Sequence, residues 1–174
     1  AGNPSPHATD ESPIEAWITT MPMSVSIGLA DWLHLEALHR YPLKIAMSES
    51  GIGWIPYLLE RANFTHNHHN AWTNSNFDGK MPSDIFNEHI ITCFIEDEFG
   101  LRNLDAINVD KVTWECDYPH SDCTWPGSAD IFWKQSQHLS DEVINKITHL
   151  NAMREFCCLR QAEACQNETQ TKER

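Results

Sequence analysis

Three short apolar runs, separated by segments with helical periodicity, constrain the fold more than any other feature of this sequence. The runs are LKIAM at residues 43–47, HIITCFI at 89–95 and KVTWEC at 111–116. Short apolar runs bounded by turn or acidic residues are typical of strands buried in a parallel sheet. Strands that alternate with helices predict right-handed crossover connections. We therefore expect an α/β fold with a parallel sheet covered by helices.

The segments between these runs predict the helices. We expect a short helix and then a longer one within residues 14–40, and further helices over 51–63, 98–107, 129–137 and from Ser140 onward. Acidic residues at 96–98 suit a helix start because they complement the positive end of the helix dipole. Residues 66–80 are polar and are expected to form a surface excursion, followed by a helix start at residues 82–84.

The length of 174 residues suits one domain. The first thirteen residues hold three prolines and no apolar periodicity. We expect an irregular lead-in loop over 1–12, the folded domain over 13–160 and a polar tail over 161–174. The chain begins with Ala rather than Met, so we expect further sequence upstream.

Composition excludes several classes of partner. The chain has 12 Lys and Arg against 25 Asp and Glu, a formal net charge of −13, and no basic run that would bind nucleic acid. No segment reaches the roughly 18 consecutive apolar residues of a membrane-spanning helix. The six cysteines show no repeated spacing, so we expect reduced and mostly buried thiols. These features argue against nucleic-acid and membrane partners, and we expect a cytoplasmic protein.

The densest group of chemically useful side chains is WECDYPHSD at residues 114–122, where the third expected strand ends. Sites in parallel α/β folds are built at that end of the strands. Asp117 there can bind a metal ion or take a proton from a metal-bound water, and His120 can hold a leaving group or a substrate oxygen. Spacing alone leaves open that Asp117 merely caps the loop and that His120 is exposed.

Strand alternation places Thr113, Glu115 and Asp117 on one face of the third strand. If Asp117 points inward, Glu115 does too, and a buried carboxylate needs a partner. The sequence offers three cations for that role without ranking them: Arg61, Arg102 and Lys111.

Four segments occur together in order along the chain: PMSVSIGLADWL (22–33), PLKIAMSESGIGWIPYLLER (42–61), CDYPHSDCTWP (116–126) and NAMREF (151–156). Together they resemble the amidohydrolase-related family of metal-dependent hydrolases and decarboxylases, which includes aminocarboxymuconate-semialdehyde decarboxylase. The resemblance implies a TIM (β/α)8 barrel, of which this chain is the C-terminal part with roughly strands 6 to 8. It also implies a divalent metal, usually zinc, held by a first-strand His-x-His pair, a histidine after the fifth strand and an aspartate after the eighth.

The motifs of this family assign roles to three residues. Asp117 matches the eighth-strand aspartate that binds the metal and handles the proton of the attacking water, and His120 matches the histidine of the DYPH pattern. Glu49 stands where decarboxylase relatives carry a histidine, and we expect it to orient water or substrate. The resemblance thus implies Asp117, His120 and Glu49 as catalytic residues and Asp117 as the metal ligand.

The other metal ligands of the family have no match in this chain. The only His-x-His spacing is residues 66–68, which follows the expected sixth strand. The opening residues resemble the loop after the fifth strand, so that strand's histidine would lie just before Ala1. A fragment, a split protein or a decayed copy would each explain this pattern.

Two hypotheses about function follow. In the first, the complete protein is a metal-dependent hydrolase, or a non-oxidative decarboxylase and hence a lyase. In the second, the chain is a catalytically silent or partner-dependent half barrel, whose open strand edges are covered by a second copy or by a complementing N-terminal half.

Overall fold

The computed structural model describes residues 11–75 and 77–156, and within them three parallel strands form one sheet. The strands are β1 (Ile45–Met47), β2 (Ile90–Phe94) and β3 (Val112–Trp114), in the order β1-β2-β3. In the parallel register, Ile45 is opposite Ile90 and Thr92 is opposite Val112. The α/β fold with a parallel sheet is confirmed, and each strand is shorter than the apolar run that predicted it.

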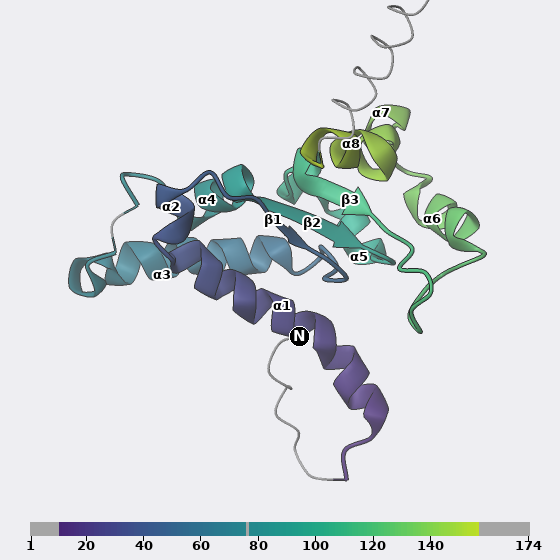
Figure 1. Ribbon diagram of the computed structural model, residues 1–174, viewed down its shortest axis with the longest axis horizontal. Helices are drawn as coiled ribbons and strands as arrows, with labels where there is room; N and C mark the ends of the chain where they lie inside the picture. Colours follow the sequence, from purple (N-terminus) through teal and green to yellow (C-terminus); the bar gives the residue numbers. More distant parts are fainter. Residues whose placement is uncertain (1–10, 76, 157–174) are drawn as a thin grey trace, which may run out of the picture.

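Eight α-helices among the described residues surround this sheet: α1 (Ile14–His34), α2 (Ala37–Arg40), α3 (Ile55–Thr73), α4 (Pro82–His89), α5 (Glu98–Arg102), α6 (Ser128–Ser136), α7 (Asp141–Asn145) and α8 (Asn151–Glu155). Turns of 3₁₀ helix lie at Leu104–Ala106 and Val109–Lys111, and the π-helical turn Lys146–Leu150 joins α7 to α8. Figure 1 shows α3 alongside β1 and β2, and α8 beside β3. The lead-in before residue 11 and the predicted tail lie outside the described residues.

The hydrophobic core lies between the sheet and its helices. All five residues of β2 are buried, as expected for the central strand of a parallel sheet. Ile90, Phe94 and Val112 belong to the core cluster together with Phe132 of α6 and Ile147 of the π-helical turn. The next residues along β2 and β3 project to the other face of the sheet, because side chains alternate along a strand. That second face carries the residues that support the functional site.

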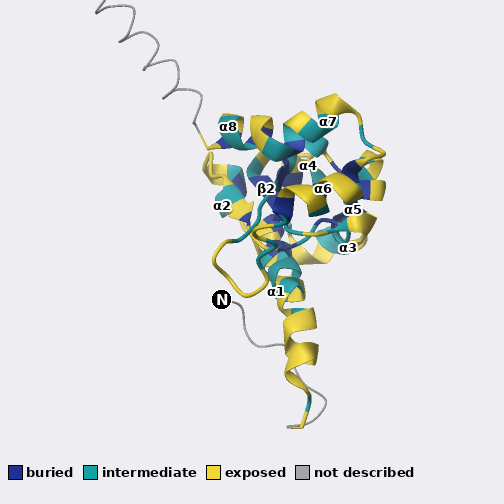
Figure 2. Ribbon diagram, turned by 90° about the vertical axis from the view of Figure 1, so that its right-hand side faces the viewer, coloured by how far each residue is buried: buried dark blue, intermediate teal, exposed yellow. Residues whose placement is uncertain are grey.

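The prediction for residues 14–40 is wrong in the order of its helices. The long helix α1 comes first and the short α2 second. Pro22 lies inside α1, although a proline removes one helical hydrogen bond. Pro22 lies in the first half of α1, whose residues are mostly exposed, and Figure 2 shows that one end of α1 extends from the body of the molecule. Leu29 and Leu33, both fully buried, attach the second half of α1 to the core.

The prediction of a surface excursion from residue 66 is also wrong, because α3 continues to Thr73. Phe77 folds back onto this helix, is 4% exposed, and stacks on His66 with 4.5 Å between ring centroids. Asn63 and Ser83 exchange two hydrogen bonds of 3.0 Å between α3 and α4. These tertiary contacts outweigh the weak helix propensity of the polar residues in the second half of α3.

An ion network closes the amino-terminal end of the sheet. The carboxylate of Glu155 in α8 is 4% exposed and lies 2.6 Å from Lys44 Nζ and 3.3 Å from Lys111 Nζ, residues that precede β1 and β3. Burial alone would raise the pKa of Glu155, but the hydrogen bonds from Lys44, Arg154 and Lys111 lower this pKa to about 2. Glu155 and its cationic partners therefore form a clamp that attaches α8 to the residues preceding β1 and β3.

Asn151 completes this clamp. It is fully buried, and its side-chain amide donates to the carbonyl oxygens of Val109 and Val112, both at 2.7 Å.

In the part of the chain that the structure describes, no helix is both long and apolar enough to cross a membrane.

Candidate metal and substrate site

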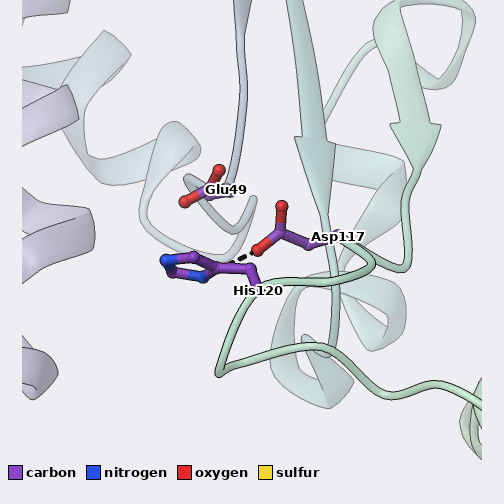
Figure 3. Close-up of side chains that lie close together, drawn as sticks. All are labelled: Glu49, Asp117 and His120. Atoms are coloured by element: carbon purple, nitrogen blue, oxygen red, sulfur yellow. Dashed lines mark ion pairs between the residues drawn. The ribbon is translucent and has the colours of Figure 1, made fainter.

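Glu49, Asp117 and His120 lie together at the carboxyl ends of the strands, as Figure 3 shows. One ligand atom from each residue lies within 4.8 Å of the other two. Glu49 comes from the loop after β1, whereas Asp117 and His120 come from the loop after β3. The structure thus brings the three predicted site residues together, although their assigned roles stay a prediction.

Left-handed backbone conformations aim both carboxylates at this point. Glu49 has φ = 57° and Asp117 has φ = 56°. A residue other than glycine adopts this conformation at a cost, and such residues cluster at functional sites. The two loops therefore hold a disfavoured backbone conformation at the positions that bring the carboxylates together.

The side chain of Asp117 is available for a ligand. Its Oδ2 atom is buried and accepts no hydrogen bond from the described residues, although His120 Nδ1 lies 2.9 Å away at ion-pair distance. The loop itself is closed by the backbone, since His120 N–H donates to the Asp117 carbonyl oxygen at 2.8 Å. Asp117 is thus not needed as a side-chain cap, and its buried oxygen, which has only an ion pair with His120 and no hydrogen bond among the described residues, could bind a metal ion.

The donor atoms present suit a divalent cation. Two carboxylates and one imidazole are ligands that Zn²⁺ and Mn²⁺ accept. The side chain of Asp117 is 19% exposed and that of His120 is 50% exposed, so the group faces an opening. Asp117, His120 and Glu49 are therefore the described residues that could hold a metal ion.

Glu115 has partners other than the predicted ones. Its Oε1 accepts a hydrogen bond from the backbone N–H of Glu49 at 2.6 Å and from the thiol of Cys93 at 2.8 Å. The prediction of a cationic partner is wrong, because an amide and a thiol together meet the needs of this half-buried carboxylate. The three candidate cations lie elsewhere: Lys111 at Glu155, Arg102 at Glu98 and Arg61 over the ring of Phe64.

Cys93 acts as a hydrogen-bond donor at this position. Burial, together with the hydrogen bond to Glu115 and its negative charge, raises the pKa of the Cys93 thiol to about 12. The sulfur therefore keeps its proton at neutral pH. Cys93, Cys116 and Cys123 are free thiols, as predicted, and the remaining cysteines lie outside the described residues.

Asp97 fixes the loop that carries Glu49. It caps α5 by accepting from Gly100 N–H, and it also accepts from the N–H groups of Ile52 and Gly53, each bond measuring 2.7 Å. The acidic residues at 96–98 predicted the helix start but not this bridge between two loops. Only the register of β1 beside β2 brings the two loops together.

A cleft of about 600 Å³ opens beside the three residues. One wall comes from α1 and the floor comes from the loops after the strands. The lining residues are Ile18, Met21, Pro22, Ser24, Val25, Ser48, Glu49, Ser50, Gly51, Ile95, Glu96, His120 and Asp122. This combination of an apolar wall and a polar floor is typical of a small-molecule site.

Solved structures with the same fold come from decarboxylases and related amidohydrolases. The 5-carboxyvanillate decarboxylase LigW from Sphingomonas paucimobilis superposes with a TM-score of 0.62 at 20% identity, over 82% of this chain and 41% of that one. A dihydroxybenzoic acid decarboxylase from Polaromonas sp. JS666, solved with manganese and the inhibitor 2-nitroresorcinol, gives 0.58 at 21% identity, over 85% and 47%. An amidohydrolase from Mycobacterium avium subsp. paratuberculosis K-10 gives 0.67 at 20% identity, over 84% and 36%.

The chain thus spans less than half the length of these structures, and their likeness to it shows a shared α/β fold. Comparison with curated protein sequences gave no match. The family model described as amidohydrolase matches residues 25–156, which include the loops that carry Glu49, Asp117 and His120. The chain belongs to the amidohydrolase family.

Proposed function

We propose that this chain is the C-terminal part, with strands 6 to 8, of a metal-dependent amidohydrolase barrel that acts on a small-molecule substrate. The observation that carries the proposal is the buried Oδ2 of Asp117, which accepts no hydrogen bond from the described residues and faces Glu49 and His120. The sequential order β1-β2-β3 of parallel strands is also the order of neighbouring strands in a barrel.

Asp117 would bind the divalent metal, for which we propose Zn²⁺, with His120 and Glu49 beside it. When bound, the ion would supply Lewis acidity, lowering the pKa of a water or polarising a substrate oxygen. Asp117 would accept the proton of the attacking water through a carboxylate oxygen. His120 would hold a substrate oxygen or leaving group, and Glu49 would orient the water or the substrate.

The reaction is either hydrolysis or non-oxidative decarboxylation, as a lyase. The related structures include enzymes that decarboxylate 5-carboxyvanillate and dihydroxybenzoic acid, so carboxylated phenols are the first compounds to assay. The cleft beside Glu49 measures about 600 Å³, which is enough space for a ring of that size.

A second candidate function is that of a partner-dependent half barrel without activity of its own. It is favoured by the length of the chain relative to its structural relatives, and by the outer edges of β1 and β3, which pair with no strand among the described residues. A second copy or a complementing N-terminal half would cover these edges. Under either candidate, we propose a cytoplasmic location and no nucleic-acid or membrane partner.

The test is metal binding by the purified chain. We expect the 174-residue chain to bind Zn²⁺ or Mn²⁺, with an affinity that Asp117→Asn lowers at least about tenfold. The two reactions are separated by CO₂ release from carboxylated phenols and by cleavage of an ester panel. A chain that binds no metal, and gains none when a co-expressed upstream half joins it, would exclude the enzymatic proposal.

A further inference from the structure

We propose that Glu115 is a positioning residue that sets the Glu49 carboxylate toward Asp117 and His120 by holding the backbone of Glu49. The inference rests on the proposed function, because it concerns how this chain presents ligands to a divalent cation. Glu115 itself lies on the strand side of the loops and need not touch the cation.

The first step is the hydrogen bond from the N–H of Glu49 to Glu115 Oε1, at 2.6 Å. A charged acceptor makes a stronger hydrogen bond than a neutral one. This bond fastens the residue whose φ of 57° is unfavourable for a side chain larger than hydrogen. The contact thus offsets the cost of the left-handed conformation at the position where it is needed.

The second step is the position of Glu115 itself. Thr113 lies opposite Cys93 in the register of β2 and β3, and the N–H of Glu115 donates to the Phe94 carbonyl oxygen at 3.1 Å. The protonated thiol of Cys93 donates to the same Oε1 that holds Glu49. Contacts with β2 therefore hold the Glu115 carboxylate in place, and this carboxylate in turn holds Glu49 in the loop after β1.

The third step is the consequence for the site. Asp97 holds the following residues of that loop by accepting from Ile52 and Gly53, so Glu49 lies between two anchored points. A ligand atom of Glu49 then lies within 4.8 Å of ligand atoms of Asp117 and His120, and Figure 3 shows the three side chains close together. Without Glu115, the backbone at Glu49 can relax to a right-handed or extended conformation, and the carboxylate would leave the group.

The experiment compares Mn²⁺ binding by the full chain, measured by the loss of the free-ion paramagnetic resonance signal, among matched variants. We expect Glu49→Ala and Glu115→Ala each to weaken binding about tenfold. The double variant should be no weaker than Glu49→Ala, because Glu115 acts through Glu49. Glu115→Gln should stay within about twofold of the unchanged chain, since its amide oxygen still accepts from Glu49 N–H.

Two controls exclude a general effect. Glu142→Ala removes the same charge from α7 and should leave Mn²⁺ binding unchanged. Hydrogen exchange of the residue-49 amide should be about tenfold faster in Glu115→Ala and unchanged in Glu115→Gln, which reports the hydrogen bond without any metal.

Each other outcome overturns the inference. If Asp117→Asn weakens Mn²⁺ binding and Glu115→Ala does not, the proposed function stands and the role of Glu115 is wrong. If Glu115→Ala weakens binding equally with and without Glu49, Glu115 acts by another route. If the unchanged chain binds Mn²⁺ only when a co-expressed upstream half joins it, the same variants are compared in that complex. If it binds no Mn²⁺ in either form, both proposals fall together.

Discussion

The two ends of the sheet hold buried carboxylates in opposite states. At the amino-terminal end, Glu155 has three cationic partners, and its pKa is held near 2. At the carboxyl end, Asp117 Oδ2 is buried without a hydrogen-bond partner among the described residues, in a loop with left-handed backbone. Three cations hold Glu155, so its carboxylate stabilises the fold, whereas Asp117 has among the described residues only the half-exposed imidazole of His120 at ion-pair distance, so its carboxylate can accept a further ligand. The comparison separates the end that holds the fold together from the end that is available for chemistry.

Among the substitutions considered, removal of the Glu155 carboxylate is expected to have the largest effect on stability. Glu155→Ala should lower the free energy of unfolding by about 3 kcal/mol, because Lys44, Lys111 and Arg154 lose the buried carboxylate between them. Urea denaturation measures this change. Glu88→Ala is the matched control, since its ion pair with Lys80 is half-exposed, and it should cost less than about 1 kcal/mol. Equal losses in the two variants would contradict a special role for the Glu155 clamp.

Acid should lower the stability that Glu155 contributes at the amino-terminal end of the sheet. The folded-state pKa of Glu155 is about 2, below its ordinary value of 4.5, so its contribution is complete above pH 4.5 and is lost as the pH falls toward 2. Over this window the unchanged chain should lose about 2 kcal/mol more stability than Glu155→Gln, allowing for the exposure of Lys44 and Arg154. Urea titrations of both proteins at several pH values test this. Parallel pH profiles would show that Glu155 does not titrate as described.

At the carboxyl end, the carboxylate of Asp97 differs from that of Asp117 because it accepts hydrogen bonds from three backbone N–H groups. Asp97→Ala removes the acceptor of three backbone N–H groups and should cost about 1.5 kcal/mol. Asp97→Asn, which keeps one oxygen acceptor, should cost about half as much. Denaturation of the two variants checks the order, and a larger loss in Asp97→Asn would refute the bridging role.

The smallest effect on stability is expected at Asp117. Asp117→Asn should change the free energy of unfolding by less than about 0.5 kcal/mol, since Oδ2 accepts no hydrogen bond from the described residues and its ion pair with the half-exposed His120 is weakened by solvent. The same denaturation experiment, run without metal, measures this. A loss as large as that of Glu155→Ala would mean that Asp117 is a structural residue rather than a ligand.

Sequence reasoning predicted the strands better than the helices, and it did not predict the contacts that hold the loops of the candidate site. Apolar runs located β1, β2 and β3, most clearly the fully buried β2, because a strand buried on both faces must be hydrophobic. The extent of α3 escaped prediction, because Phe77 stabilises its polar second half only after the chain folds back. The sequence also did not predict the partners of Glu115, because the alternation of side chains along one strand does not give the register of that strand with its neighbour.

By itself, the sequence determined the alternation of strands and helices, the acidic charge, and the motif residues Glu49, Asp117 and His120, because all of these depend on local periodicity or on residue identity. Only the tertiary structure decided what these residues contact. It placed Glu49 beside Asp117 and His120, and it brought Glu49 into hydrogen-bond contact with Glu115, which is 66 positions away along the chain. The physical reason is that parallel pairing brings the carboxyl ends of distant strands to one edge, and the hydrogen bonds available there, such as those to Glu115 and Asp97, exist only once that edge has formed.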